Sequence, residues 1–208
     1  MPQGVEKETS VTRERLLDAA ESAILEKGFG ATSIDELIAA VGITKSGFFY
    51  HFKGKGALAE ALLRRYLDRE RVLLDYIFGR ADQLHDDPLH AFLIGLKMLA
   101  EMLEDLPGGN PGCLMAAYCY QDQLFNREVR ELHRSAVMAW RERFSVRIAA
   151  IAAVHKPKQA VQPDDLADML CALVDGGMII GKAVGDDGLL SRQLLLYRDL
   201  VLQVFTGD

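Results

Sequence analysis

The chain has 208 residues, of which 50% are hydrophobic and 26% charged, a globular composition that excludes disordered and collagen-like proteins. Its 24 Lys and Arg residues against 30 Asp and Glu residues give a net charge of −6, which excludes a protein that coats nucleic acid through bulk positive charge. Residues 42–58 nevertheless hold three lysines and no acid, so a local charge of +3 stands against −9 for the rest of the chain.

Four helices are predicted in the N-terminal part from the spacing of apolar residues and from end signals. Gly28 is a natural stop for the first, and Ser33 with Glu36 forms a capping box at the start of the second. The hydroxyl group of Thr44 can cap the third. We expect these helices at residues 12–27, at 33–42, directly after Thr44, and at 55–78.

Proline and glycine clusters divide the remainder into five further helices. These are expected at residues 88–106, 113–125, 126–154, 164–185 and 190–205. Alternating strand patterns are nearly missing from the sequence. The fold class is therefore predicted to be all-α with about nine helices, divided into an N-terminal three-helix domain at residues 1–54 and a larger helical bundle at 55–208.

The sequence carries no pattern of a secretory or membrane segment. Residues 1–10 are polar, and the longest uncharged run, 106–121, contains Pro107 and Pro111, which exclude a membrane-spanning helix there. Three cysteines without paired spacing favour reduced thiols, and no Cys/His spacing predicts zinc. We expect a cytoplasmic protein with no membrane partner, metal site or cofactor.

Residues 32–58 hold the pattern that says most about function, two short helices joined by a tight turn. Gly42 supplies the positive φ of that turn, and such a pair is typical of a helix-turn-helix, whose second helix enters the DNA major groove. Short polar groups and a lysine suit base edges, whereas Tyr, His and flanking lysines suit phosphates. The candidates are Thr44, Lys45, Ser46 and Gly47, followed by Tyr50, His51, Lys53 and Lys55.

This segment resembles the DNA-binding signature of the TetR (tetracycline-repressor-like) regulators. The resemblance is carried by Thr32-Ser33-Ile34, by Gly42-Ile43-Thr44-Lys45-Ser46-Gly47, and by Phe48-Phe49-Tyr50-His51-Phe52-Lys53-x-Lys55. It covers about residues 10–60 and extends to the family's length and helical C-terminal part. It implies a homodimer that binds a palindromic operator in double-stranded DNA and releases it when a small-molecule effector enters the C-terminal domain.

The resemblance also implies roles for single positions. Residues 44–47 match positions that face the bases or the groove, and residues 50–51 match contacts to the DNA backbone. Lys55 matches a phosphate contact that opens the fourth helix, and residues 32–33 match contacts at the start of the second. Phe49 stands where the family usually has a tyrosine whose hydroxyl touches phosphate, so the chain departs from the pattern there.

Large apolar and sulfur-containing residues in the C-terminal part are candidates for an effector pocket, with ordinary core packing as the alternative. Cys113 follows a Pro-Gly break at the start of a helix, where a thiolate is stabilised, so modification of this thiol by oxidants or electrophiles is a further hypothesis. The pocket candidates are Met98, Met102, Cys113, Tyr118, Phe125, Trp140 and Phe144.

Small residues on the penultimate predicted helix suggest that another helix approaches it closely. Gly177 and Gly181 lie on one face, and Leu196 and Leu200 belong to the apolar last helix. The resemblance implies that these two helices form the four-helix dimer interface of the family. Packing within one chain is the alternative.

Two other classes of function compete with a ligand-responsive repressor. An enzyme is not supported, because the sequence has no nucleophile–base motif, no paired metal ligands and no glycine-rich cofactor loop after a strand, so we predict no catalytic residue. A helical dimeric adaptor that has lost sequence-specific DNA reading stays open because of Phe49. The sequence leaves open whether the effector releases DNA or promotes its binding.

Overall fold

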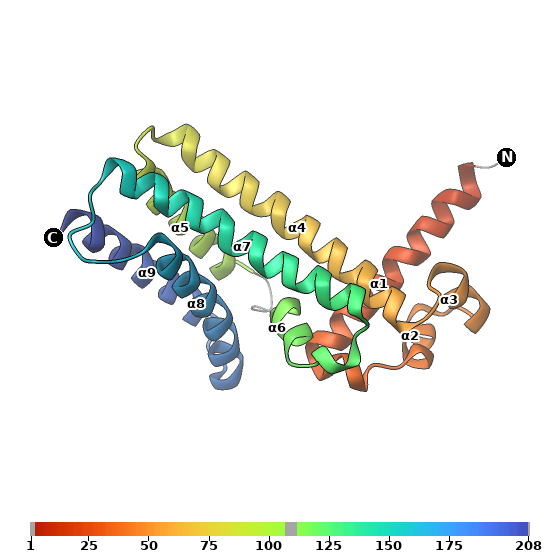
Figure 1. Cartoon of the computed structure of the whole chain (residues 1–208). Coiled ribbons are helices and arrows are strands. Elements are labelled where there is room, and N and C mark those ends of the chain that lie inside the picture. Colours follow the sequence, from red (N-terminus) through yellow and green to blue (C-terminus); the bar gives the residue numbers. More distant parts are fainter. Residues whose placement is uncertain (1–2, 107–111, 208) are drawn as a thin grey trace. The chain divides into compact units, whose positions relative to one another are not determined.

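The computed structural model describes residues 3–106 and 112–207, which form nine α-helices, one short 3-10 helix and no β-strand (Figure 1). The predicted all-α class is confirmed. Within those residues, no helix combines the length and the apolar character needed to cross a bilayer. The helices are α1 (Gln3–Ala31), α2 (Ile34–Val41), α3 (Lys45–His51), α4 (Lys55–Leu84), α5 (Pro88–Glu104), α6 (Leu114–Cys119), α7 (Arg127–Val154), α8 (Pro163–Val184) and α9 (Leu189–Thr206), with the 3-10 helix η1 at Asp122–Leu124.

The chain packs as two compact units. The N-terminal unit comprises the residues up to Asp68 together with Cys113–Ser135, and the second unit comprises Arg69–Gly112 and the residues from Ala136 onward. Packing therefore does not divide at residue 54. The first turns of α4 and the segment that carries α6 belong with α1, α2 and α3, because they complete the same apolar core.

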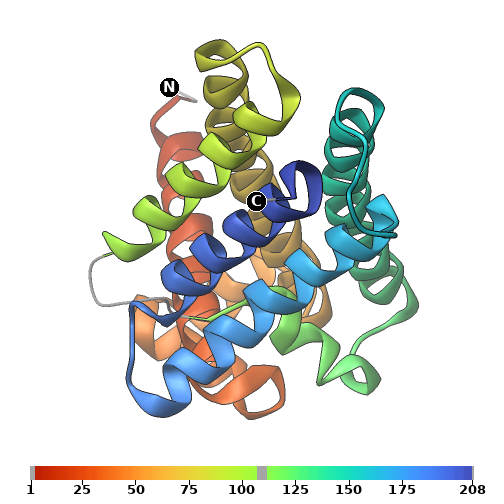
Figure 2. The same ribbon diagram turned by 90° about the vertical axis from the view of Figure 1, so that its left-hand side faces the viewer.

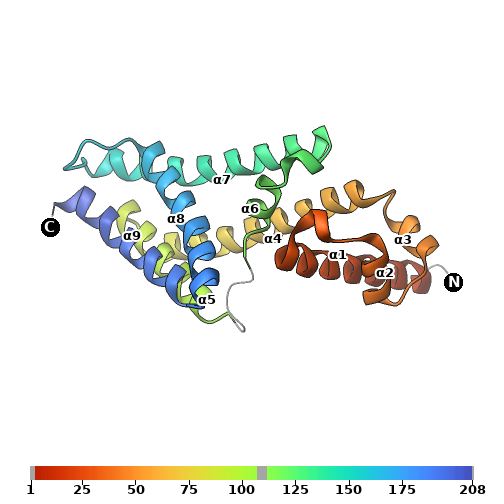
Figure 3. The ribbon, with the colours of Figure 1, turned by 90° about the horizontal axis from the view of Figure 1, so that it is seen from below.

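The core of the N-terminal unit explains why its short helices are stable. Leu16 and Leu17 of α1, Leu37 of α2, Phe48 of α3 and Leu62 of α4 are almost completely buried in one cluster. Helices of seven or eight residues are marginal alone, so most of their stability comes from this burial. Figure 3 shows α2 and α3 beside α1, so the helix-turn-helix is fixed to the longer helix.

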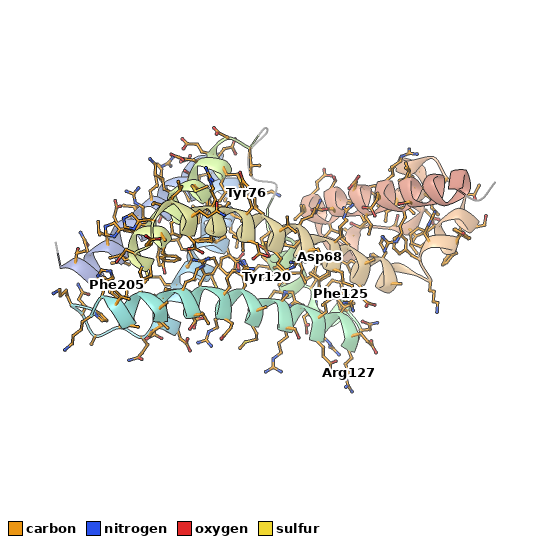
Figure 4. All side chains as sticks on the ribbon, turned by 90° about the horizontal axis from the view of Figure 1, so that it is seen from above. Asp68, Tyr76, Tyr120, Phe125, Arg127 and Phe205 are labelled. Carbon is orange, nitrogen blue, oxygen red and sulfur yellow. The ribbon has the colours of Figure 1, made fainter. Side chains whose placement is uncertain are left out.

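An aromatic cluster joins α6 to the end of α1. The ring of Phe29 lies with its centroid 4.5 Å from Phe125 and 6.4 Å from Tyr118, and the last two rings stack at 4.4 Å. The hydroxyl of the buried Tyr118 donates a 2.8 Å hydrogen bond to the carbonyl of Ala59. Phe125 lies just before α7, near Arg127 (Figure 4).

In the second unit, α9 lies between α5 and α8 (Figure 2). The rings of Phe78, Phe92 and Phe144 form the centre of its core and are fully buried. The hydroxyl of the buried Tyr197 donates a 2.8 Å hydrogen bond to the carbonyl of Leu166, which ties α9 to α8. The last turn of α9 continues this core through Phe205, labelled in Figure 4.

Candidate nucleic-acid interface

The turn between α2 and α3 forms as its sequence predicts. Ser33 caps α2, with its Oγ accepting a 3.1 Å hydrogen bond from the backbone N–H of Glu36, and the Glu36 carboxylate accepts from the backbone N–H of Ser33 in return. Gly42 ends α2 in the left-handed conformation (φ 73°, ψ 40°). A Cβ at Gly42 would meet no atom within 4 Å, so the requirement for glycine there is conformational rather than spatial. Arg15 of α1 also holds this end of α2, by a 2.8 Å hydrogen bond to the carbonyl of Val41.

Polar groups line the start of α3. Thr44 is the N-cap, and its Oγ1 accepts a 3.1 Å hydrogen bond from the backbone N–H of Gly47 and lies 2.9 Å from the hydroxyl of Ser46. The ammonium of Lys45 lies 3.7 Å from a carboxylate oxygen of Asp35 on α2, and both side chains are exposed. The start of α3 therefore presents the hydroxyls of Thr44 and Ser46 and the amine of Lys45 to solvent, and Thr44 also caps the helix.

The aromatic run of α3 divides between core and surface. Phe48 and Phe52 are buried, whereas Phe49 is 47% and Tyr50 75% exposed. An exposed Tyr50 hydroxyl is available to a phosphate oxygen, and Phe49 offers only a ring. His51 is half-buried, and its pKa is lowered by burial and by the nearby Arg13, so the neutral imidazole is favoured at pH 7.

Thr32 does not belong to this surface. Its side chain is only 2% exposed, and its hydroxyl donates a 2.9 Å hydrogen bond to the carbonyl of Gly28. The hydroxyl of Thr32 therefore stabilises the turn from α1 to α2, and the predicted contact of this residue with DNA stays a prediction. Ser33 is exposed, and its predicted contact stays a prediction.

Lys55 is turned toward its own chain. Its ammonium donates hydrogen bonds to the carbonyls of Phe29 and Gly30, the second at 3.4 Å, and lies 4.2 Å from the centroid of the Phe29 ring. Burial lowers the pKa of this amine. The predicted phosphate contact of Lys55 is untested, and the structure gives the residue an internal role that the sequence did not indicate. Lys53 is exposed, and its predicted phosphate contact also stays a prediction.

Three supporting residues were missed by sequence reasoning. Gln121 accepts a 2.8 Å hydrogen bond from the backbone N–H of Gly30, although 91 positions separate them. Gly28 adopts φ 86°, which favours glycine, and a Cβ there would displace the side-chain amide of Gln121, whose nitrogen would lie 2.3 Å away. Arg65 of α4 is mostly buried among carboxylates of α1, with oxygens of Glu14, Asp18 and Glu21 at 2.7–3.0 Å. No local sequence signal marks these contacts, because each depends on tertiary packing.

The seven predicted effector residues are divided between the two units. Cys113, Tyr118 and Phe125 belong to the N-terminal unit, where Tyr118 and Phe125 are core and Cys113 caps α6, with its sulfur 3.5 Å from the backbone nitrogen of Ala116. Their assignment to an effector pocket stays a prediction. The remaining four belong to the second unit: Phe144 is fully buried, and Met98, Met102 and Trp140 are partly buried against its core.

The two glycines predicted at a dimer interface serve the packing of α8 against α9. A Cβ at Gly177 would lie 2.8 Å from Cδ1 of Leu190, and a Cβ at Gly181 would lie 2.9 Å from the carbonyl oxygen of Asp186. Both glycines are buried within one chain, where they allow α8 and α9 to approach closely, and their assignment to a dimer interface stays a prediction. Leu200 also packs on this core, whereas Leu196 is 60% exposed and remains a candidate.

The short helices α2 and α3 and the turn between them form a helix-turn-helix, a motif typical of DNA-binding proteins. A family model described as "Bacterial regulatory proteins, tetR family" matches residues 16–62, which hold this motif. This segment of the chain is therefore similar to the bacterial regulatory proteins of the tetR family.

Similar proteins fall in the same class. The uncharacterized HTH-type transcriptional regulator YvkB of Bacillus subtilis (strain 168) is 33% identical over 91 residues, 44% of this chain and 45% of that protein. The HTH-type transcriptional repressor KstR2 of Mycolicibacterium smegmatis (strain ATCC 700084 / mc(2)155) is 31% identical over 74 residues, 36% of this chain and 33% of that protein. These alignments span less than half of either relative.

The likeness of fold extends over nearly the whole chain. The crystal structure of a TetR-family transcriptional regulator from Agrobacterium tumefaciens superposes with a TM-score of 0.78 at 17% identity, covering 95% of this chain and 100% of that one. At this identity the match describes the fold alone.

Proposed function

We propose that the protein is a homodimeric repressor that binds a palindromic operator through α3 and changes its affinity for DNA when a small molecule binds to the second unit. The observation that carries the proposal is the exposed first turn of α3, where Thr44, Lys45 and Ser46 face solvent on a helix whose opposite side is anchored by Phe48. An α-helix fits the B-DNA major groove, and such side chains suit base edges.

The supporting contacts make this surface rigid enough to read DNA. Capping by Ser33 and Thr44, the left-handed Gly42, and the bond from Arg15 to Val41 fix the two helices without using Lys45 or Tyr50. The pairing of Lys45 with Asp35 is exposed and long, so it is weak and readily exchanged for a DNA contact.

A homodimer is proposed because one helix-turn-helix contacts only a half-site. Two copies would have to present α3 about 34 Å apart to enter successive major grooves. The exposed apolar residues of α8 and α9, namely Met169, Ile179, Ile180, Val184, Leu196 and Leu202, offer a surface for the partner chain. An effector bound to the second unit would alter DNA affinity only through its preference for one spacing of the two heads.

The test is binding of the purified chain to DNA from upstream of its own gene, followed by fluorescence anisotropy at several salt concentrations. We expect a steep loss of affinity with salt, and a Lys45→Ala variant that loses both affinity and preference for the specific site. Lys97→Ala is the matched control, because Lys97 is an exposed lysine of α5 paired with Glu101 and remote in sequence from α3. Equal binding of wild type to specific and unrelated DNA would contradict operator recognition and favour the adaptor.

A further inference from the structure

Three of the chain's five histidines gather around one carboxylate in the second unit. His85 directly follows α4, Asp87 caps α5, His90 lies in the first turn of α5, and His155 directly follows α7. Nδ1 of His90 lies 2.9 Å from Oδ1 of Asp87, and Nε2 of His155 lies 2.5 Å from Oδ2 of the same carboxylate. The ring of His85 stacks on that of His90, with centroids 4.7 Å apart.

Helix capping does not account for this arrangement. The cap consists of a 3.0 Å hydrogen bond from the backbone N–H of His90 to Oδ1 of Asp87, and it needs no imidazole. Two imidazoles and a carboxylate are instead a donor set suited to divalent first-row transition metals, because imidazole nitrogen binds Zn²⁺, Ni²⁺, Cu²⁺ and Fe²⁺ well and a carboxylate oxygen adds a negative charge.

The spacing of the donor atoms fits such an ion. One potential ligand atom from each of His85, Asp87 and His90 lies within 4.8 Å of the other two. Bonds of about 2.0–2.1 Å in a tetrahedron place neighbouring ligand atoms roughly 3.3 Å apart, so the donors must close by about 1.5 Å at most. His85 and His90 are exposed, and rotation of their side chains can supply that movement. We propose that His85, Asp87 and His90 form a binding site for a divalent transition-metal ion, with Zn²⁺ as its representative.

The surrounding charges favour a cation. Two helices end here, because the backbone N–H of His85 donates to the carbonyl of Ala81 at the end of α4 and that of His155 to the carbonyl of Ile151 at the end of α7. The negative ends of the α4 and α7 dipoles therefore lie near the site, against only one positive end, that of α5, so the helix dipoles together favour a cation. Nε2 of His155 contacts Oδ2 of Asp87, whereas Oδ1 lies next to His90. His155 thereby orients the carboxylate without being a metal ligand itself, a role that outer-shell residues have in metal sites.

Three protein ligands leave a fourth position for water or for a donor atom of a small molecule, as in open zinc sites. The proposal departs from the expectation that the chain has no metal site. That expectation considered only paired Cys/His spacings, whereas this set forms where α4 turns into α5, with His155 reaching Asp87 from 68 positions away.

The experiment is a titration of the untagged, full-length protein with Zn²⁺ by calorimetry and with Co²⁺ by visible absorption, whose intensity reports the coordination number. We expect one ion per chain and a Co²⁺ spectrum without the sulfur-to-metal band that Cys113, Cys119 or Cys171 would give. The double variant H85A/H90A and the single variant Asp87→Asn should each weaken binding by about tenfold or more. Asparagine retains the helix cap, so loss of binding in that variant cannot be attributed to loss of α5.

The matched control is His133→Gln. His133 is outside the cluster, and its Nε2 lies 2.9 Å from the carbonyl oxygen of Met115, a contact that a glutamine amide can replace. Binding that persists in His133→Gln and disappears in H85A/H90A supports the site. Absence of Zn²⁺ binding by the wild type, equal binding by H85A/H90A, or a sulfur-to-metal band would each overturn it. The readout is metal binding, so its failure leaves the proposed DNA function untouched.

Discussion

Replacement of Lys55 by methionine separates two roles that the sequence and the structure give to this residue. The sequence assigns its ammonium to a DNA phosphate, whereas in the structure the ammonium binds the carbonyls of Phe29 and Gly30 and lies over the Phe29 ring. Lys55→Met removes the charge and keeps most of the aliphatic stem. Lys53→Ala is the matched comparison, because Lys53 is an exposed lysine two positions away.

The magnitude of the effect follows from these contacts. A hydrogen bond from a charged donor contributes about 1.5–3 kcal/mol, and a cation over an aromatic face adds about 0.5–2 kcal/mol, while desolvation of the amine offsets part of both. We therefore expect Lys55→Met to lower the free energy of unfolding of the N-terminal unit by about 2 kcal/mol. Lys53→Ala should change it by less than about 0.5 kcal/mol, as is usual for surface positions.

Salt dependence measures the other role. Each phosphate contact contributes about 0.9 to the slope of log affinity against log salt, so losing one lysine contact from each chain of a dimer lowers the slope by roughly 2. We expect that decrease for Lys53→Ala and an unchanged slope for Lys55→Met. Thermal and urea unfolding followed by circular dichroism, with anisotropy titrations at several salt concentrations, measures both quantities. A Lys55→Met protein of wild-type stability with a slope lowered by about 2 would refute the internal role.

Three further changes test the second unit. Gly181→Ala should lower the free energy of unfolding by about 1–3 kcal/mol, because its Cβ would lie 2.9 Å from the carbonyl oxygen of Asp186; denaturant unfolding measures this. Leu196→Glu should leave the stability of the monomer unchanged and shift the proposed dimer toward monomer, as measured by sedimentation, because Leu196 is 60% exposed. Glu70→Gln should abolish a fall in stability between about pH 4.5 and pH 7, as measured by unfolding at several pH values, because burial and Asp175 raise the pKa of Glu70 to about 7.

The sign of the Glu70 effect follows from proton counting. Between its ordinary pKa of 4.5 and about 7, the carboxyl group binds more protons in the folded chain than in the unfolded chain, so stability falls as pH rises. The full difference corresponds to about 3 kcal/mol as an upper bound. Glutamine resembles the protonated acid, so the variant should be at least as stable as wild type at pH 8. A Glu70→Gln variant with the same pH dependence as wild type would contradict the prediction for Glu70. A Gly181→Ala protein of wild-type stability would contradict the prediction for Gly181, and a Leu196→Glu protein that remains fully dimeric would contradict the one for Leu196.

The local pattern of the sequence was sufficient to predict the helices and the turn. Capping by Ser33 and the left-handed Gly42 both depend on the backbone within a few residues, and both are confirmed. Phe48 and Phe52 are buried, because helical spacing determines which side of a short helix faces its neighbours. The first helix begins earlier than predicted, at Gln3, since the polar residues before Thr12 carry no apolar periodicity.

The sequence could not show which polar groups are used inside the protein. Thr32 and Lys55 have the residue types expected at a DNA surface, yet both satisfy backbone carbonyls at the end of α1. Likewise, a stripe of glycines fits packing within a chain as well as packing between chains, and the sequence did not show that Gly177 lies against Leu190 of the same chain. These outcomes depend on partners far away in the sequence, which periodicity does not encode.

The end of α1 explains why residues that resemble DNA contacts have internal roles. Gly28 adopts a non-helical conformation that kinks α1 near its end, and side chains from outside the helix bind the carbonyls of residues 28–30. The hydroxyl of Thr32 donates a hydrogen bond to the carbonyl of Gly28, and the ammonium of Lys55 donates to the carbonyls of Phe29 and Gly30. Ser33 and α2 follow directly after this end of α1. The hydrogen bonds of Thr32 and Lys55 to its carbonyls therefore also determine where α2 and α3 begin. Loss of the Lys55 ammonium should therefore weaken binding to all DNA sequences alike, through misplacement of the reading helix, while base preference stays with Lys45.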